Sequence, residues 1–564
     1  MNKILKKITL LSAATLLTTS CIDETFPESS TVTADQLAAS ADAFVASVNG
    51  ISSQMSQWYY VYGEQEHETD MGYLMYLIAD TELLGDMYPE GSNSGYDWFR
   101  AYNVCQGMGL QSYASYLSWF TSYKLIKAAN DVISVVEDPE SANDAMKTYL
   151  AEAYAYRALF YYQLMVHWEP VANEYTDCSD VLGLTVPIVT EKTTAEESMK
   201  NPRVSHEEMV KFIISDLELA EKYMVEGPAN KNRPSLACVY GVRARVHMWD
   251  EDYENAAKYA RMAINEHGAD PMSETQWLDV NTGFNTAVGA WMWKCSYDAE
   301  NMANLCNWTG WMASEADWGY SSLTCPAIDR SLYDHIAYTD FRKQAFLDPD
   351  RKKSDPKNPG HRLYEYKTCR PDVDTDGDGK TDSLWTDLQP NYLSLKFRCK
   401  GGNYETYTIG GLCDVPIMRV EEFYLLEAEA VARTKGLEEG RALLNDFVKT
   451  WRDAEYSCNA KDVDALAKEV LTQIRIEFWG EGIGFANAKR LRAGVMQNYA
   501  GTNAPADIFK LNCRGIKPNW NFVIPQYEID SNSILGEQNN PDPSSVVKTP
   551  CKEGEYAVGA HAVE

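Results

Sequence analysis

The chain has 564 residues and a formal net charge of −31 at pH 7. A surface this acidic repels nucleic-acid phosphates and anionic lipid headgroups, which argues against both as partners. Hydrophobic residues make up 45% of the chain and charged residues 24%, as in a folded globular protein. Aromatic residues reach 12%, so we expect some rings to lie at a surface as well as in the core.

The first residues have the pattern of a targeting signal. A basic start is followed by a mostly apolar run of roughly ten residues, which is too short to span a bilayer. Small residues then lead directly to Cys21. This order predicts a lipoprotein signal peptide over 1–20, an acylated Cys21 and a polar tether over 21–34. The alternative is an ordinary secretory signal in which Cys21 is accidental.

Several segments repeat apolar residues at the spacing of an amphipathic helix. Ser205 followed by Glu208 forms a capping box, which marks one helix start. The predicted helices cover 117–137, 147–168, 205–224, 234–249, 253–266, 421–434, 437–451 and 463–481.

The helices at 234–249 and 253–266 are joined by a short acidic turn. Small residues follow the turn at Ala256, Ala257 and Ala260, a spacing that lets two helices approach closely. This pattern is typical of a tetratricopeptide hairpin. We therefore predict a mainly α fold, with tetratricopeptide-like helical hairpins as its scaffold.

The predicted helices fall into two parts of one unit, an N-terminal part over 35–271 and a C-terminal part with an irregular tail over 412–564. The stretch between them, 272–411, is rich in Trp, Asn, Asp, Gly and Pro and lacks long helical periods. We predict a large insertion of loops and short strands there. Long loops on a rigid frame usually carry function, so we expect the ligand face in this insertion.

Two aromatic segments are candidates for that ligand face. Exposed rings offer flat apolar faces that match the C–H face of a sugar, while nearby polar groups bond its hydroxyls. The alternative is that these rings anchor loops in the core. The predicted ligand-binding residues are Tyr96, Trp98, Asn103, Trp308, Trp311, Trp318 and Tyr320.

A run of alternating aspartates offers hard oxygen ligands of the kind that calcium prefers. Counted from Asp374, the twelfth position is Trp385 where an EF-hand has Glu, so the full EF-hand pattern fails. We expect a structural Ca²⁺ here; the alternative is a solvated polar loop. The predicted ligands are Asp372, Asp374, Asp376, Asp378 and Asp382.

No sequence motif indicates catalysis. GxSxG, HExxH and the P-loop pattern are absent, and none of the 13 cysteines forms a CxxC pair. Glu477 and Glu481 lie one helical turn apart, but such a pair is more often a solvated face. A glycosidase carboxylate pair stays open as an alternative in so acidic a chain. We expect a non-enzymatic protein without a catalytic cofactor.

Recognisable motifs follow one another along the chain at 119–133, 151–161, 186–188, 203–220, 244–253, 416–430, 474–482, 524–525 and 539–541. Taken in this order, they resemble the motifs of the SusD/RagB family of Bacteroidota outer-membrane lipoproteins. Arg475 and Glu477 depart from the Glu-Arg order of one of these motifs.

The resemblance implies a non-enzymatic, surface-exposed lipoprotein with a tetratricopeptide-type scaffold and an irregular ligand face. Members of the family sit as a lid on a SusC-like TonB-dependent transporter and hand it glycans or, in some members, peptides. The chain would then be held at the outer membrane by its N-terminal lipid alone. The matching motifs resemble scaffold, so Arg157, Arg419 and Glu427 are expected in structural ion pairs. A peptide-binding lid and a tetratricopeptide scaffold for protein interaction remain the alternatives.

Overall fold

The computed structural model describes residues 41–58, 67–89, 96–103, 105, 107–299, 307–505, 509–546 and 551–559. The predicted signal peptide, Cys21 and the predicted tether lie outside these ranges. None of the helices in the described ranges has the length and apolar character needed to cross a membrane.

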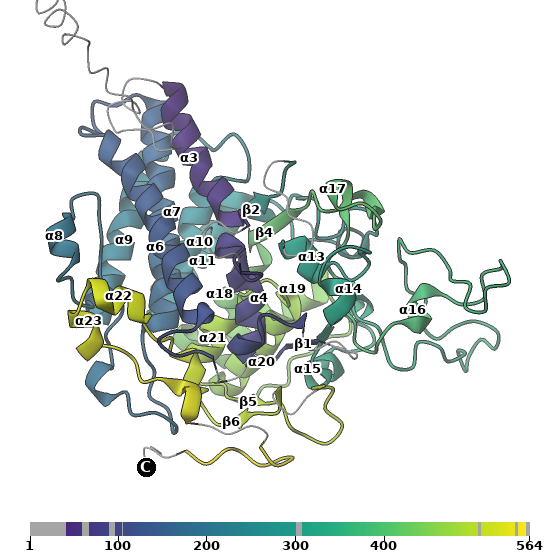
Figure 1. Ribbon diagram of the computed structural model, residues 1–564. Helices are drawn as coiled ribbons and strands as arrows, with labels where there is room; N and C mark the ends of the chain where they lie inside the picture. Colours follow the sequence, from purple (N-terminus) through teal and green to yellow (C-terminus); the bar gives the residue numbers. More distant parts are fainter. Residues whose placement is uncertain are drawn as a thin grey trace, which may run out of the picture.

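Long helices form the scaffold and confirm the predicted mainly α fold (Figure 1). Before the insertion these are α3 (Ala41–Ser56), α6 (Tyr113–Val135), α7 (Asp144–Trp168), α9 (His206–Tyr223), α10 (Leu236–Trp249) and α11 (Tyr253–His267). After the insertion they are α18 (Glu421–Lys435), α19 (Leu437–Trp451) and α20 (Val463–Glu477).

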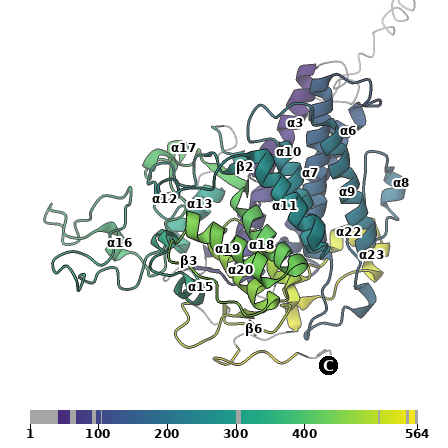
Figure 2. The same cartoon turned by 180° about the vertical axis from the view of Figure 1, so that it is seen from behind.

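These helices pack on one another in nearly continuous order. Helix α6 packs on α7, α7 on α9, α9 on α10 and α10 on α11. The stack then continues from α11 to α18 and on to α19 and α20, although the whole insertion separates α11 from α18 in sequence. The two predicted helical groups therefore form one scaffold (Figure 2).

Local sequence explains where particular helices begin and end. The Ser205 side chain accepts the backbone N–H of Glu208, and the Glu208 side chain accepts the backbone N–H of Ser205. These two bonds confirm the predicted capping box at the start of α9. Helix α20 ends at Glu477, short of the predicted 481. Gly480 has a φ of +76°, and a Cβ at this position would lie 2.5 Å from the ring of Phe397. A left-handed backbone at Gly480 is incompatible with an α-helix that continues to 481, and glycine adopts it without strain.

Short elements complete the fold. The remaining helices outside the insertion are η1 (Gly72–Leu74), α4 (Met75–Leu83), α5 (Arg100–Asn103), η3 (Ser179–Val181), α8 (Ala195–Ser198), α21 (Gly484–Arg490), η7 (Pro518–Trp520), α22 (Gln526–Ser531), α23 (Ile534–Glu537) and η8 (Pro543–Ser545). Within the insertion they are α12 (Glu274–Leu278), α13 (Trp308–Met312), α14 (Ser321–Thr324), α15 (Arg330–His335), η4 (Phe341–Ala345), α16 (Trp385–Leu388), η5 (Lys400–Gly402) and α17 (Tyr407–Gly410).

Three two-stranded antiparallel sheets are present in the described residues: β1 (Met87–Pro89) with β3 (Pro326–Ile328), β2 (Trp291–Ser296) with β4 (Asp414–Arg419), and β5 (Val495–Met496) with β6 (Asn512–Cys513). The pair β2–β4 joins the beginning and the end of the insertion, with Trp291 opposite Arg419 and Ser296 opposite Asp414. The insertion therefore begins and ends at the helical scaffold, where this pair of strands holds its two ends together.

One part of the insertion projects from the body around α16, as both views show (Figures 1 and 2). We call residues 349–391 the arm. The chain leaves and re-enters the body side by side, because the Tyr392 N–H donates to the Leu347 carbonyl at 2.7 Å and the Leu347 N–H donates to the Leu393 carbonyl at 3.0 Å. The base of the arm is thus fixed by a short antiparallel bridge.

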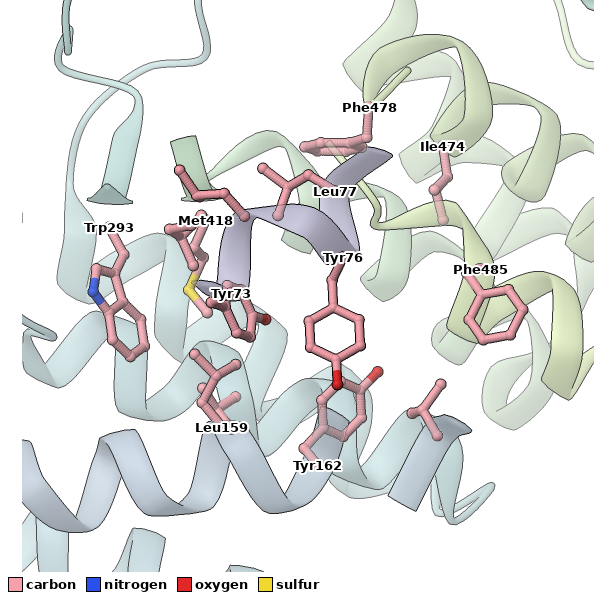
Figure 3. Close-up of a cluster of buried hydrophobic side chains, with 14 of the residues drawn as sticks. Tyr73, Tyr76, Leu77, Leu159, Tyr162, Trp293, Met418, Ile474, Phe478 and Phe485 are labelled. Atoms are coloured by element: carbon pink, nitrogen blue, oxygen red, sulfur yellow. The ribbon is translucent and has the colours of Figure 1, made fainter. Parts of the chain in front are cut away.

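The short helix α4 and the turn before it lie at the centre of the core. Tyr73 and Tyr76 pack against Leu159 and Tyr162 of α7 (Figure 3). The hydroxyl of Tyr76 donates to the Ser118 carbonyl at 2.6 Å, so its polar tip is satisfied. Burying a side chain of this size stabilises the fold by about 1.5–3 kcal/mol.

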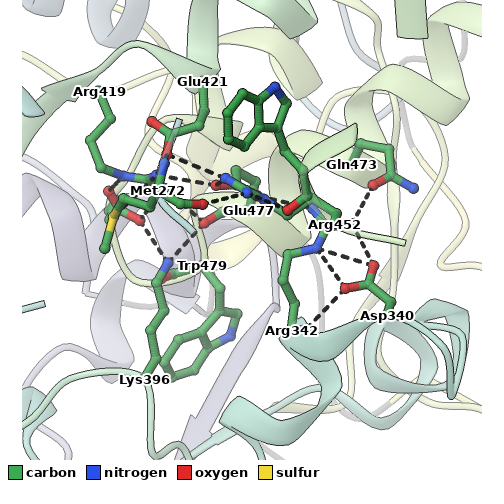
Figure 4. Close-up of polar contacts among 12 residues, drawn as sticks. Met272, Asp340, Arg342, Lys396, Arg419, Glu421, Arg452, Gln473, Glu477 and Trp479 are labelled. Carbon is green, nitrogen blue, oxygen red and sulfur yellow. Dashed lines mark hydrogen bonds and ion pairs between the residues drawn. The ribbon is translucent and has the colours of Figure 1, made fainter. Parts of the chain in front are cut away.

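A buried ion network joins the insertion to the C-terminal helices (Figure 4). Glu477 is fully buried and lies 3.1 Å from Arg419, 2.7 Å from Arg452 and 3.1 Å from Arg342. Burial acts to raise the pKa of the Glu477 carboxyl, but the three arginines outweigh it and hold that pKa far below its ordinary value. The expected solvated face at Glu477 and Glu481 is therefore wrong, because arginines compensate both carboxylates inside the core.

The residues expected in structural ion pairs form them. Arg157 contacts Asp216 and Glu191, each at 2.7 Å. Glu427 pairs with Arg261. The motifs that resemble the family are scaffold at these positions.

Candidate functional site

The predicted tryptophan platform is not an open surface. Trp308, Trp311 and Trp318 are 1%, 4% and 8% exposed, so the expectation of exposed indole faces is wrong for all three. Buried Asn307 caps α13, which turns Trp308 onto Phe397 at a ring distance of 4.6 Å. The alternative reading, in which these rings anchor loops in the core, fits their burial.

Asn103 is also part of the interior. The side-chain N–H of Asn103 donates to Glu82 at 3.0 Å, and the side-chain oxygen of Asn103 accepts a hydrogen bond from Gln497 at 2.6 Å. It is fully buried and cannot reach a ligand at the surface. The prediction of a ligand contact at Asn103 is therefore wrong, because burial requires that its polar atoms be bonded within the protein.

The remaining predicted rings form a small surface patch. Tyr96 is 45% exposed and Trp98 36% exposed. The ring of Tyr96 lies 6.2 Å from that of Tyr320, which in turn stacks on Trp311 at 4.9 Å. The structure thus brings the two predicted aromatic segments together. We call Tyr96, Trp98 and Tyr320 the Tyr96 patch.

A more open aromatic surface lies where the arm meets the body. Tyr338 is 74% exposed, and its ring lies 6.2 Å from that of Tyr364. Tyr364 stacks on Tyr366 at 6.1 Å with 24° between the ring planes. These rings border a groove of about 560 Å³. The residues of this tyrosine groove are Tyr338, Lys343, Gln344, Asp350, Leu363, Tyr364, Glu365 and Tyr366.

The tyrosine groove is anchored from below by hydrogen bonds. Tyr366 donates its hydroxyl to the Phe346 carbonyl at 3.0 Å and accepts the Asp348 N–H at 2.9 Å. The ammonium group of Lys343 donates to the Ile336 carbonyl at 2.8 Å and lies 4.7 Å from the ring centre of Tyr338. These bonds hold Tyr366 and Lys343 in place, and side chains that are already ordered lose less entropy when a ligand binds.

The arm itself is held by two arginines. Arg351 is buried and donates to the Thr386 carbonyl at 2.8 Å and to Asn391 at 2.7 Å. Arg362 pairs with Asp387 at 2.5 Å. Because Arg362 directly precedes the segment that carries Tyr364, this ion pair helps to position one wall of the groove.

Sequence reasoning missed the tyrosine groove, although one signal was available. Tyr364 and Tyr366 alternate with Glu365, and a period of two places alternate side chains on one face of an extended segment. Tyr338 gives no comparable signal, because only tertiary packing brings it beside the arm. The residues that line the groove include no tryptophan, whereas the predicted ligand-binding residues include four.

The aspartate run forms the tip of the arm. Carboxylate oxygens of Asp374, Asp376 and Asp382 lie within 4.8 Å of one another, a separation that a single hard cation can bridge. Asp372 and Asp378 do not belong to this trio. Both oxygens of Asp374 also accept backbone N–H groups at 2.7 Å, which lowers the pKa of its carboxyl and keeps it ionised. The three residues fit a calcium ion by charge and donor type.

Comparison with known proteins agrees with the motifs in the sequence. Residues 52–248 match a family described as "Starch-binding associating with outer membrane", and residues 294–541 match the SusD family. The chain is 29% identical over 172 residues to SusD-like protein P38 of Formosa agariphila, a match that covers 30% of this chain and 30% of that protein. The aligned part thus spans under a third of that relative's length.

Solved structures share the fold across most of the chain. A SusD-like carbohydrate binding protein from Bacteroides vulgatus is 18% identical, with a TM-score of 0.67 over 89% of this chain and 98% of that chain. Surface glycan-binding protein A from Bacteroides thetaiotaomicron is 17% identical, with a TM-score of 0.62 over 89% and 98% of the two chains. The two family matches, which together cover most of the chain, show that it belongs to the SusD/RagB family.

Proposed function

We propose that this protein captures glycans and that the tyrosine groove is where it holds them. The observation that carries this proposal is the row of Tyr338, Tyr364 and Tyr366, because these neighbouring rings border an open groove and hydrogen bonds to the body hold Tyr366. A phenol ring packs against the apolar C–H face of a sugar without needing a charge on the ligand. Neutral ligands also suit a strongly acidic protein.

Polar groups of the groove complement the rings. The side chains of Gln344, Asp350 and Glu365 border the same groove, and each offers oxygen acceptors for sugar hydroxyls. Gln344 also offers an N–H donor. Ring faces for apolar contact, with a few polar groups that fix orientation, are the usual composition of a small-molecule site.

A shallow row of rings favours a glycan over a peptide. A peptide-binding lid would be expected to use a deep acidic cleft without exposed rings, whereas Tyr338 is 74% exposed at the edge of the groove. The Tyr96 patch offers further exposed rings, and we propose it as a second contact for an extended glycan. For Tyr96 and Trp98, ligand contact is the role predicted from the sequence, and we propose it here because both rings are exposed.

Family membership supports the rest of the proposal. We propose that the protein is anchored at the cell surface through an acylated Cys21 and passes its ligand to a SusC-like TonB-dependent transporter. We also propose that it binds without catalysis. Glu477 and Glu481, the carboxylates one helical turn apart, are enclosed by arginines in the core and are not available to a glycosidic bond.

The acidic tip of the arm adds a proposed calcium site. Asp374, Asp376 and Asp382 would supply the ligands, and the bound ion would hold the tip closed. Its role is structural, because no ring of the tyrosine groove belongs to this loop.

A binding screen tests the proposed function. The purified full-length protein is run through native gels that contain starch, xylan, mannan, pectin or β-glucan, and is titrated in parallel with a mixed peptide pool. We expect retardation by at least one polysaccharide and no heat of binding with peptides. Binding to peptides alone would overturn the proposal.

A further inference from the structure

We propose that His247, Asp250 and Asp252 form a binding site for Zn²⁺ or a similar divalent transition metal. The site lies at the turn between α10 and α11, in the helical scaffold. One donor atom from each of the three side chains lies within 4.8 Å of the other two. This proposal does not depend on the ligand of the tyrosine groove, because no residue is shared between the two places.

The buried imidazole of His247, which has no hydrogen bond to the residues that the structure describes, is the observation that points to a ligand. Its side chain lies on the last turn of α10 and only 7% of the residue is exposed. Neither ring nitrogen makes a hydrogen bond within the part of the chain that the structure describes. Nδ1 lies 3.3 Å from Oδ2 of Asp252, but the contact lacks the direction that a hydrogen bond needs. Buried polar atoms are normally bonded, so a missing partner requires an explanation.

The orientation of the imidazole suits a metal. The ring of His247 stacks on Tyr259 at 5.5 Å with 9° between the planes, so its orientation is fixed. A neutral imidazole with a fixed orientation is the form in which histidine ligates metals.

The two carboxylates are positioned by the turn itself. Asp252 caps α11 by accepting the Asn255 N–H at 3.2 Å, and Asp250 caps the end of α10. Glu251 between them adopts a left-handed φ of +57°. The two acidic side chains consequently reach the same place as His247, although no single helix face would bring them together.

Charged side chains from the neighbouring elements surround the cluster. His206 of α9 contacts Oδ1 of Asp250 at 3.0 Å and Glu169 at 2.9 Å, and these carboxylates raise the pKa of His206. Arg243 and Lys258 lie near His247 and oppose a cation. The acidic residues Glu169, Asp250, Glu251 and Asp252 outnumber the opposing side chains only slightly, so we expect moderate affinity.

Donor chemistry indicates the class of metal. One imidazole nitrogen with two carboxylate oxygens suits Zn²⁺, Mn²⁺ or Co²⁺, and water would complete the coordination. Calcium prefers oxygen ligands throughout and belongs with the arm tip instead. A metal ion here would hold α10 and α11, the two helices of one hairpin, together.

Zinc titration with a matched pair of variants tests the site. The full-length protein is dialysed against chelator and titrated with ZnCl₂ by calorimetry. We expect His247→Gln to weaken zinc binding roughly tenfold or more, and the same change at exposed His361 to leave it unaltered. Saturating zinc should raise the Tm of the wild type and the His361→Gln variant, but not that of His247→Gln.

Asp252→Asn provides a second test should His247→Gln fold poorly, because asparagine retains the helix cap while losing the charge. We expect it too to bind zinc roughly tenfold more weakly than the wild type. Equal zinc affinity in the wild type and both folded variants would overturn the proposal, as would the absence of any zinc binding by the wild type. Polysaccharide binding should be unchanged in both variants, which separates this site from the tyrosine groove.

Discussion

Arg419 and Glu477 form an ion pair with Nη1 and Oε1 3.1 Å apart, and neither side chain is exposed to water. Arg419 is the last residue of β4, which closes the insertion, and Glu477 is the last residue of α20. The pair therefore ties the insertion to the helical scaffold. Charges enclosed in this way are stable only while each retains its partners.

Removal of one member of this buried ion pair should destabilise the fold. We expect Arg419→Met to lower the free energy of unfolding by about 3–5 kcal/mol, because Glu477 and Glu481 would lose a buried counter-charge. Urea denaturation measures the change. Arg441→Met is a matched control, since Arg441 pairs with the largely exposed Glu438 and should cost at most about 1 kcal/mol. Equal, small losses in the two variants would show that the network does not stabilise the fold.

Trp311 should behave as a core residue. We expect Trp311→Ala to lower the free energy of unfolding by about 3–5 kcal/mol, because it leaves a cavity beneath Tyr320 and beside Phe99. Tyr96→Ala, at an exposed ring that contacts Tyr320, should cost much less. Urea denaturation of both variants checks the contrast. A stable Trp311→Ala protein would contradict the packing described for α13.

Calcium should stabilise the arm. We expect a chelator specific for Ca²⁺ to lower the Tm of the wild type, and the double variant Asp374→Asn with Asp382→Asn to show no such response. Asp372→Asn is the control, because Asp372 lies outside the converging trio and should leave the response intact. Differential scanning calorimetry gives the Tm values. An identical Tm for the wild type with and without chelator would exclude a stabilising calcium ion.

Stability near the Tyr96 patch should depend on pH. Burial raises the pKa of the Asp97 carboxyl from 3.8 to about 7. Between these values the unfolded chain has released this proton while the folded protein retains it, so the free energy of unfolding falls as pH rises. Above about pH 7 both states are ionised and this contribution no longer changes.

Asp97→Asn isolates that effect, because the amide cannot titrate. We expect its stability to fall less than that of the wild type when urea denaturation is compared at about pH 4.5 and about pH 7.5. Glu82, whose pKa is also raised by burial, remains in both proteins. Parallel changes in the two proteins would show that Asp97 does not keep its proton on folding.

Much of the scaffold was predictable from sequence. Helix α19 was predicted with its observed bounds, and the Ser205 cap marked the start of α9, because helical period and capping are local properties. The early end of α20 was not predictable. Gly480 has a left-handed φ of +76°, and the ring of Phe397 that leaves no room for a side chain there comes from a distant part of the chain.

The site was predicted less well, for a physical reason. The sequence shows where aromatic residues are but not whether the fold buries them. Trp308 and Tyr96 were therefore both predicted as exposed rings, although Trp308 is buried and Tyr96 is exposed. The tyrosine groove depends on Tyr338 meeting Tyr364 across the base of the arm. Such a meeting is set by long-range packing, and no local pattern reports it.

Affinity for a retained polysaccharide, measured by calorimetry for the wild type, Tyr338→Ala and Tyr364→Ala, tests the proposed groove most directly. We expect each variant to lose about 1–3 kcal/mol of binding free energy while its Tm stays near that of the wild type. Tyr527→Ala, at a ring 55% exposed on α22, should bind like the wild type. Wild-type affinity in both groove variants would contradict the assignment of glycan capture to the tyrosine groove.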